Sequence, residues 1–120
     1  CYQAYTSFIE YLDERGLLDT TMLLAWGEFG RTPRVNATGG RDHYPNVFSA
    51  AVAGGGIVGG RVVGQSDTKG ALPQENPKDP QDVLATLYRH VGVNIAEHYL
   101  DNHGRPIRVL PHGEPIDELF

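Results

Sequence analysis

The sequence predicts an α/β fold, because helix-like and strand-like segments alternate along its 120 residues. Two short apolar runs, at residues 22–26 and 47–53, lack polar alternation, which is typical of strands buried on both faces. Segments with helical spacing of apolar side chains lie before the first run and well after the second. The order helix, strand, loop, strand, helix, strand favours the edge of an α/β sheet over an all-α or all-β fold.

The first helix is expected where apolar side chains recur at helical spacing, at Tyr5, Phe8, Ile9 and Leu12. Gly16 is expected to end this helix, because glycine readily adopts the left-handed conformation that follows a last helical turn. Residues 20–26 are then predicted to form a core strand, and residues 47–53 a second one. A glycine-rich turn at residues 54–60 and a brief edge strand at residues 61–64 are expected next.

The second half of the chain contains the clearest helix signal. Residues 65–78 are polar and contain prolines, so they are predicted to form an exposed loop. Asp79 suits an N-cap and Pro80 suits the first helical position. The buried stripe of this helix is expected at Val83, Leu84, Leu87, Tyr88 and Val91, with Gly92 ending it. A turn and a last strand are predicted within residues 104–110.

Composition narrows the classes of function. The net charge of -5 and the pI of about 5.4 argue against generic binding to nucleic acid. No run approaches the roughly 18 apolar residues of a membrane span, so no transmembrane segment is predicted. The chain begins at Cys1, and we interpret it as the C-terminal part of a longer protein. A mature lipoprotein also begins with cysteine, but here helix-like sequence starts at once, without a flexible tether.

The loop between the two predicted strands carries the candidate chemistry. Its charged and imidazole side chains are Glu28, Arg31, Arg34, Arg41, Asp42 and His43. Because α/β enzymes build their sites from loops at strand ends, this loop is the predicted functional site.

Each of these side chains has a functional and a structural interpretation. His43 is a candidate metal ligand oriented by Asp42, a general base, or a histidine that only fixes the turn. Glu28 is a metal ligand, an ion-pair partner of an arginine, or simply an exposed residue. Arg31 and Arg41 suit bidentate binding of phosphate or sulfate, or they neutralise the two acids.

The glycine run offers a weaker hypothesis. Gly54, Gly56 and Gly59 match the dinucleotide-binding pattern G-x-G-x-x-G, which requires a helix immediately afterwards. Residues 60–64 do not resemble a helix, so a crowded turn between two closely approaching segments is the favoured interpretation. Asp67 is interpreted as a turn residue, and the remaining histidines receive no role.

These motifs resemble a known family. The segments Gly27-Glu28-Phe29-Gly30-Arg31-Thr32-Pro33 and Gly39-Gly40-Arg41-Asp42-His43-Tyr44-Pro45, followed by the glycine run, resemble the C-terminal part of the bacterial family of domain of unknown function 1501. The likeness continues through residues 64–67, the Pro80 helix and residues 104–107, and so covers nearly the whole chain.

The resemblance implies membership of the alkaline phosphatase and sulfatase superfamily. It implies a partial α/β/α sandwich of alkaline phosphatase-like type, with residues 1–120 as the C-terminal portion of a single larger domain. It also implies a periplasmic or secreted protein. In that superfamily an Asp-His pair binds metal where Glu28-Phe29 stand here, and phenylalanine cannot coordinate a metal. His43 matches a histidine that precedes the next core strand.

The resulting hypothesis is a fragment of a metal-dependent hydrolase of phosphate or sulfate esters. Glu28 and His43 are its expected ligands to a divalent metal ion, either zinc, calcium or manganese. Asp42 is expected to orient His43, while Arg31 and Arg41 hold the anion of a small-molecule or polysaccharide ester. The nucleophile and the remaining ligands are expected from the N-terminal part of the same domain. The alternative is a non-catalytic protein that binds anions or sulfated polymers on a degenerate hydrolase fold, or serves as a structural protein.

Overall fold

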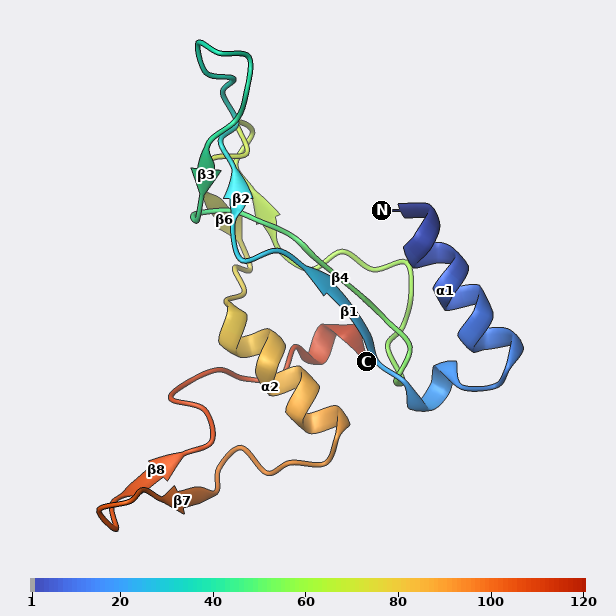
Figure 1. Cartoon of the computed structure of the whole chain (residues 1–120), viewed down its shortest axis with the longest axis vertical. Helices are drawn as coiled ribbons and strands as arrows, with labels where there is room; N and C mark the ends of the chain where they lie inside the picture. The colour runs from blue at the N-terminus through green and yellow to red at the C-terminus, as the bar shows by residue number, and fades with distance from the viewer. Residues whose placement is uncertain (1) are drawn as a thin grey trace. The chain divides into compact units, whose positions relative to one another are not determined.

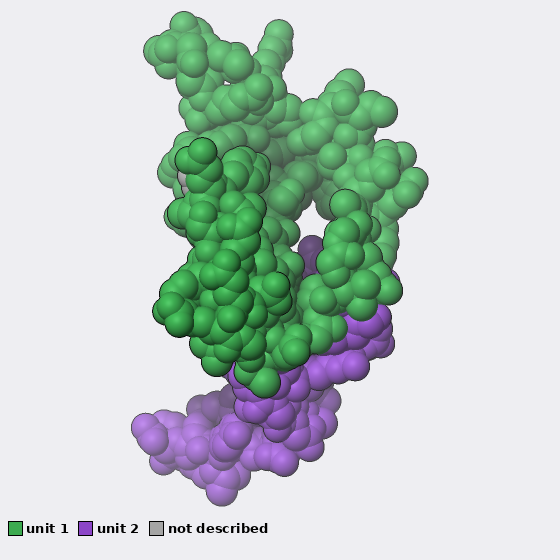
Figure 2. All heavy atoms as spheres, turned by 90° about the vertical axis from the view of Figure 1, so that its right-hand side faces the viewer, with its two compact units in different colours: residues 1–77 green, residues 78–120 purple. Residues whose placement is uncertain are grey.

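The computed structural model describes residues 2–120. These residues group into two compact units, residues 1–77 and residues 78–120, which Figure 2 colours green and purple. The secondary structure of residues 2–120 comprises two α-helices, two short 3₁₀ helices and four two-stranded antiparallel sheets.

Unit 1 begins with the first predicted helix and the first predicted strand. Helix α1 (Tyr2–Glu14) is followed by Gly16, whose φ of 65° confirms its predicted left-handed conformation. A 3₁₀ turn, η1 (Leu18–Thr20), then leads into β1 (Leu23–Trp26). The hydroxyl of Tyr5 donates a hydrogen bond of 3.3 Å to the carbonyl of Leu23, linking α1 to β1.

Strand β1 pairs with β4 (Ala50–Ala53), so the two predicted core strands are neighbours. They run antiparallel, with Leu23 opposite Ala53 and Trp26 opposite Ala50 (Figure 1). The prediction that the first strand is buried on both faces is wrong for β1. Trp26 is 41% exposed, because a ribbon of two strands shields few of its own side chains.

The glycine-rich turn after β4 confirms the prediction of closely approaching segments. Gly54 has a φ of 70°, and a Cβ built there would lie 2.3 Å from the carbonyl oxygen of Thr21. The amide of Gly55 donates to the carbonyl of Leu18 at 2.8 Å. No helix follows at residues 60–64, so the context of a dinucleotide-binding fingerprint is absent from this segment.

The rest of unit 1 differs from the predicted edge strand and exposed loop. Residues 61–64 form no strand; instead β5 (Gln65–Ser66) pairs with β6 (Pro73–Glu75) inside the predicted loop. The carboxylate of Asp67 accepts the amide of Ala71 at 2.6 Å and so closes the turn between them. The interpretation of Asp67 as a turn residue is therefore confirmed. Two polar strands of two and three residues, the second of which begins with a proline, lack the alternation by which a hairpin is recognised.

Unit 2 contains the capped helix that the sequence predicts. Helix α2 spans Pro80–His90, and Asp79 is its N-cap. The carboxylate of Asp79 accepts the amides of Gln81 and Asp82, while the Asp82 carboxylate accepts the amide of Asp79 at 2.9 Å. This reciprocal capping box satisfies amides that the first helical turn leaves without partners.

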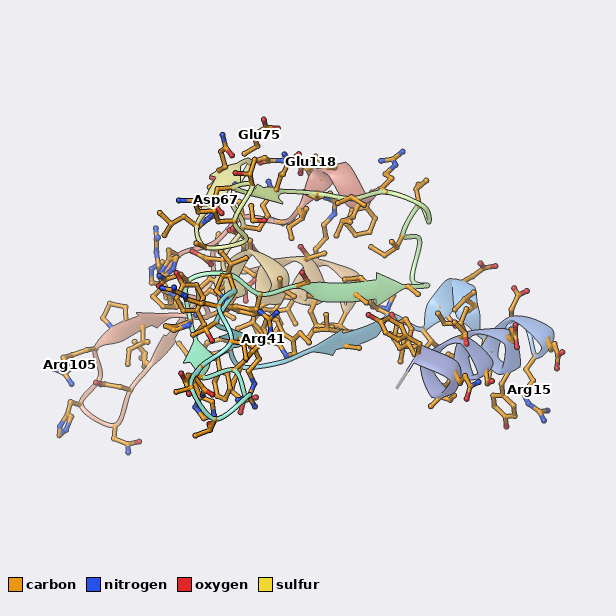
Figure 3. The ribbon with its side chains drawn as sticks, turned by 90° about the horizontal axis from the view of Figure 1, so that it is seen from above. Arg15, Arg41, Asp67, Glu75, Arg105 and Glu118 are labelled. Atoms are coloured by element: carbon orange, nitrogen blue, oxygen red, sulfur yellow. The ribbon has the colours of Figure 1, made fainter. Side chains whose placement is uncertain are left out.

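The predicted last strand belongs to a hairpin. Strand β8 (Pro106–Arg108) pairs with β7 (His98–Leu100), a strand that no sequence pattern predicted. The turn is closed by Asp101, whose carboxylate accepts the amides of His103 and Arg105, and Arg105 also forms an ion pair with it. Figure 3 shows Arg105 at this turn. The unit ends with a 3₁₀ turn, η2 (Asp117–Leu119).

The buried residues of unit 2 come from α2 and from the segment after β8. They are Ala85, Thr86, Leu110 and Ile116. The Thr86 hydroxyl donates to the Asp82 carbonyl at 2.7 Å and accepts the amide of Ile116 at 2.9 Å. Val91, which was predicted to belong to the buried stripe of this helix, is 60% exposed. The helix is thus held to the C-terminal segment partly through a buried hydroxyl.

Replacing Thr86 with valine is expected to destabilise unit 2 by about 2 kcal/mol, because the buried amide of Ile116 then loses its acceptor while the side-chain shape is kept. Urea unfolding followed by circular dichroism measures this loss. Thr86→Ser keeps the hydroxyl and serves as the control; a serine variant as unstable as the valine variant would contradict the assigned role.

The sheets of the described residues are pairs of antiparallel strands. The larger α/β/α sandwich implied by the resemblance stays a prediction, as does the placement of residues 1–120 within a single larger domain. Neither helix of residues 2–120 combines the length and the apolar character needed to cross a membrane.

Candidate functional site

The candidate site is built on a short hairpin in unit 1. Strand β2 (Gly30–Arg31) pairs antiparallel with β3 (His43–Tyr44), with Gly30 opposite Tyr44 and Arg31 opposite His43. Residues directly opposite in an antiparallel pair present their side chains to the same face. The pairing therefore brings two predicted site residues, Arg31 and His43, together across twelve positions of sequence.

An aromatic contact fixes the face on which these side chains lie. The rings of Phe29 and His43 stack with their centroids 3.9 Å apart and their planes inclined by 27°. The guanidinium carbon of Arg31 lies 5.5 Å from the centroid of the Phe29 ring. Phe29 thus contacts both functional groups, a role that was not predicted because a phenylalanine at this position signals only the loss of a metal ligand.

Asn36 organises the loop that joins β2 to β3. Its side-chain oxygen accepts the amides of Thr38 and Gly40, at 3.1 and 2.9 Å, and the Thr38 hydroxyl at 2.8 Å. Its amide nitrogen donates to the Asp42 carboxylate at 3.0 Å. One side chain therefore closes the loop from within. The signal for this role was the sequence Asn-Ala-Thr-Gly-Gly, which suits an Asx turn.

Two of the arginines are held by backbone carbonyls rather than by acids. Arg41 Nη1 donates to the carbonyls of Thr32 and Pro33, at 2.7 and 2.6 Å. Arg31 Nη1 donates to the carbonyl of Arg41 at 3.3 Å. Within residues 2–120, neither guanidinium donates from Nε or Nη2. Each is thus positioned by one nitrogen while the opposite edge stays available to an oxyanion.

The acids of the loop do not neutralise these arginines. Glu28 is exposed, and it forms neither an ion pair nor a hydrogen bond with any residue from 2 to 120. The Asp42 carboxylate accepts a hydrogen bond from the Asn36 side chain, and the backbone amide of Asp42 donates to the Thr32 hydroxyl at 3.1 Å. The alternative interpretation, in which Arg31 and Arg41 serve to neutralise Glu28 and Asp42, therefore has no support in the described contacts.

His43 contacts its surroundings through the ring face. No hydrogen bond joins its ring nitrogens to Asp42 or to any other described residue. The orientation of His43 by Asp42 stays a prediction, and Phe29 supplies the observed contact. Residues 2–120 contain no group of three or more histidine, cysteine, aspartate or glutamate side chains close enough to hold a metal ion together.

A tyrosine next to His43 ties the hairpin to the β5–β6 turn. The Tyr44 hydroxyl donates to the carbonyl of Ala71 at 2.9 Å. The amide of Ala71 in turn donates to Asp67, and this hydrogen bond lowers the pKa of the Asp67 carboxyl below its ordinary value. The turn is therefore closed by a carboxylate that stays ionised, and it supports the strand that carries His43.

The comparisons with known proteins identify the family. The chain matches the family described as "Protein of unknown function (DUF1501)" over residues 1–120. Neither a curated protein nor a solved structure shows significant similarity to it. Because the match covers the entire sequence, the chain belongs to the DUF1501 family.

Proposed function

We propose that this chain is part of a metal-dependent hydrolase of phosphate or sulfate esters. In this proposal it is the C-terminal portion of an alkaline phosphatase or sulfatase-like domain that acts in the periplasm or outside the cell. The N-terminal part of the same domain supplies the nucleophile and the remaining ligands.

The observation that carries the proposal is the pairing of Arg31 with His43 on one face of the β2–β3 hairpin. A cationic group that binds an ester anion and an imidazole suited to metal binding thereby share one surface. Arg41 Nη1 donates to the carbonyls of Thr32 and Pro33, directly after β2, which places a second guanidinium in the same hairpin. Figure 3 labels Arg41 among the side chains of this loop.

The donors on this hairpin fit part of a metal site. The stacking of Phe29 covers a face of the His43 ring, whereas a metal binds at the ring edge, where the nitrogens have no described partner. Glu28 is likewise exposed and without an ion pair. His43 and Glu28 would hold the metal together with ligands from outside residues 2–120. When bound, zinc, calcium or manganese supplies Lewis-acid polarisation of the ester oxygen.

The residues of this chain bind and orient the ester. The Nε and Nη2 groups of Arg31 and Arg41 donate to the non-bridging oxygens of the phosphate or sulfate group. Because both guanidiniums are already fixed by backbone carbonyls, little side-chain entropy is lost when the anion binds. The same donors stabilise the additional charge on these oxygens in the transition state. Asp42 maintains the loop through Asn36.

The proposal predicts that the protein carrying this chain hydrolyses an aryl phosphate or an aryl sulfate when zinc, calcium or manganese is added. Glu28→Gln and His43→Ala are each expected to lower kcat/KM by about 10-fold or more and to reduce the bound metal below one ion per molecule. Steady-state kinetics and metal analysis by mass spectrometry measure the two effects.

His103→Ala is the matched control. His103 is exposed, and its described hydrogen bond is made by the backbone amide, which the substitution keeps. Its replacement is expected to change neither turnover nor metal content. If no metal supports turnover above the level of the Glu28→Gln/His43→Ala double variant, the enzymatic proposal fails and the non-catalytic alternative replaces it.

A further inference from the structure

The imidazole of His43 lacks the partner that usually orients a metal-binding histidine. In most metal sites the second ring nitrogen donates to a carboxylate, a carbonyl or a water, which fixes the ring. Asp42, the neighbouring acid in the sequence, instead accepts a hydrogen bond from the Asn36 side chain at 3.0 Å. The Asp42 carbonyl accepts the amide of Thr32 at 3.0 Å and so extends the β2–β3 pairing. Consecutive residues of a paired strand direct their side chains to opposite faces, which favours Asn36 over His43 as the partner of this carboxylate.

Phe29 contacts His43 where the carboxylate does not. The two ring centroids are 3.9 Å apart and the planes are inclined by 27°, so the phenyl ring covers one face of the imidazole. Phe29 is half-buried, whereas His43 is exposed, so the phenyl ring is the more enclosed of the two. The guanidinium carbon of Arg31 lies 5.5 Å from the centroid of the same phenyl ring. Stacking of this kind restricts the plane of the imidazole and leaves its edge, with both nitrogens, outside the contact.

We infer that Phe29 is the positioning residue of His43, in place of Asp42. This inference rests on the proposed function, in which a ring nitrogen of His43 binds the metal. The stacked phenyl ring limits the rotamers of His43 before the metal arrives, so less conformational entropy is lost on binding. A carboxylate would occupy one ring nitrogen and select a tautomer, whereas the phenyl ring fixes the plane and leaves both nitrogens open. Phe29 therefore contributes to the site although it cannot coordinate a metal.

The first test is the NMR spectrum of the metal-free protein with ¹³C-labelled histidine rings, in which His43→Ala identifies the His43 signals by their loss. The ring current of a stacked phenyl group shifts imidazole protons upfield. Phe29→Leu is therefore expected to move the His43 signals downfield, toward those of an exposed histidine such as His103. Phe29→Tyr keeps an aromatic ring and is expected to retain the upfield shift. Asp42→Asn keeps an oxygen that can accept from Asn36 and is also expected to retain it.

The second test is zinc binding to the metal-free protein, measured by isothermal titration calorimetry. Phe29→Leu is expected to weaken zinc binding by about 10-fold, the usual effect of losing a group that orients a metal ligand. Phe29→Tyr is expected to restore the affinity of the parent. Phe8→Leu is the matched control, because Phe8 is a partly exposed phenylalanine of α1 whose described ring contact is with Tyr11. It is expected to change neither zinc binding nor the His43 signals.

Several results would overturn the inference. Unchanged His43 signals in Phe29→Leu would show that the ring is held by something else, and movement of these signals in Asp42→Asn would assign that role to the carboxylate. Equal effects of Phe8→Leu and Phe29→Leu would show an unspecific change, and a parental zinc affinity in Phe29→Leu would show that the stacking does not assist metal binding.

Two further measurements keep the inference separate from folding and from the proposed function. If Phe29→Leu does not fold, nuclear Overhauser effects between the ring protons of Phe29 and His43 in the parent test the contact directly, and their absence would overturn it. A parent protein that binds none of zinc, calcium and manganese would overturn the metal site and with it the proposed function. The histidine spectra of the metal-free protein would still decide whether Phe29 fixes the His43 ring.

Discussion

Replacing Gly54 with alanine is expected to destabilise unit 1 by at least about 3 kcal/mol, or roughly 150-fold in the folding equilibrium. Two effects add at this position. The φ of 70° is unfavourable for alanine, and the new Cβ would meet the carbonyl oxygens of Thr21 and Leu18 at 2.3 and 2.7 Å. Because both obstacles are backbone atoms, relief requires movement of the turn that supports β4 and β1.

Two neighbouring glycines separate these effects. Gly60→Ala introduces a side chain at a φ of 76° with no atom within 4 Å, so it is expected to show only the conformational cost of about 1 kcal/mol. Gly59→Ala meets neither obstacle and is expected to leave stability within about 0.5 kcal/mol of the parent. Urea unfolding of the three variants measures the series, and a Gly54 variant as stable as the Gly60 variant would contradict the close approach.

The Gly30→Ala variant is expected to lose about 3 kcal/mol and the β2–β3 pairing itself. A Cβ at Gly30 would lie 2.0 Å from the carbonyl oxygen of Val47 and 3.2 Å from that of Tyr44. The φ of Gly30 is not left-handed, so this cost is purely steric. Since Gly30 is opposite Tyr44 in the register, relief of the clash separates Arg31 from His43.

Hydrogen exchange at the amide of Thr32, which donates to the carbonyl of Asp42 at 3.0 Å beside the Arg31–His43 pair, measures this separation by NMR alongside thermal unfolding. Gly27→Ala is the control within the same segment, because its Cβ would approach the Phe29 carbonyl only to 3.4 Å, an ordinary contact. Unchanged exchange in the Gly30 variant would show that the hairpin accommodates the side chain and that the described approach of Val47 is wrong.

Local signals in the sequence predicted the helices well. The second helix was predicted to begin with Asp79 as N-cap and Pro80 as its first residue, and α2 has these features. A capping box depends on four consecutive residues, so its geometry is contained in the sequence itself. Gly16 and Gly92 were likewise expected after the two helices, and both have positive φ.

Features that depend on distant partners were predicted less well. The apolar run ending at Trp26 predicted a strand but also burial, and burial depends on what covers the strand rather than on its own residues. The β7 strand was missed because three residues are too few to show a period of two. The partners of short strands are set by tertiary contacts.

In the candidate site, too, local features were predicted better than contacts between side chains. Arg31 and His43 were predicted as parts of one candidate site in a single loop, and the structure pairs them across β2 and β3. The stacking of Phe29 on His43 depends on side-chain packing across the hairpin, which residue types alone do not determine. Metal binding, the roles of Glu28 and Asp42, and hydrolysis remain predictions.

The β1–β4 ribbon has a further consequence for handling the protein. Among residues 2–120 each of these strands pairs only with the other, so each leaves one side of its backbone amides and carbonyls unmatched. Unpaired strand edges of this kind can pair with strands of other molecules. The exposed indole of Trp26 adds an apolar surface at one end of the ribbon. A protein consisting of residues 1–120 alone is therefore expected to aggregate as its concentration rises. Dilute, freshly refolded samples suit its study best.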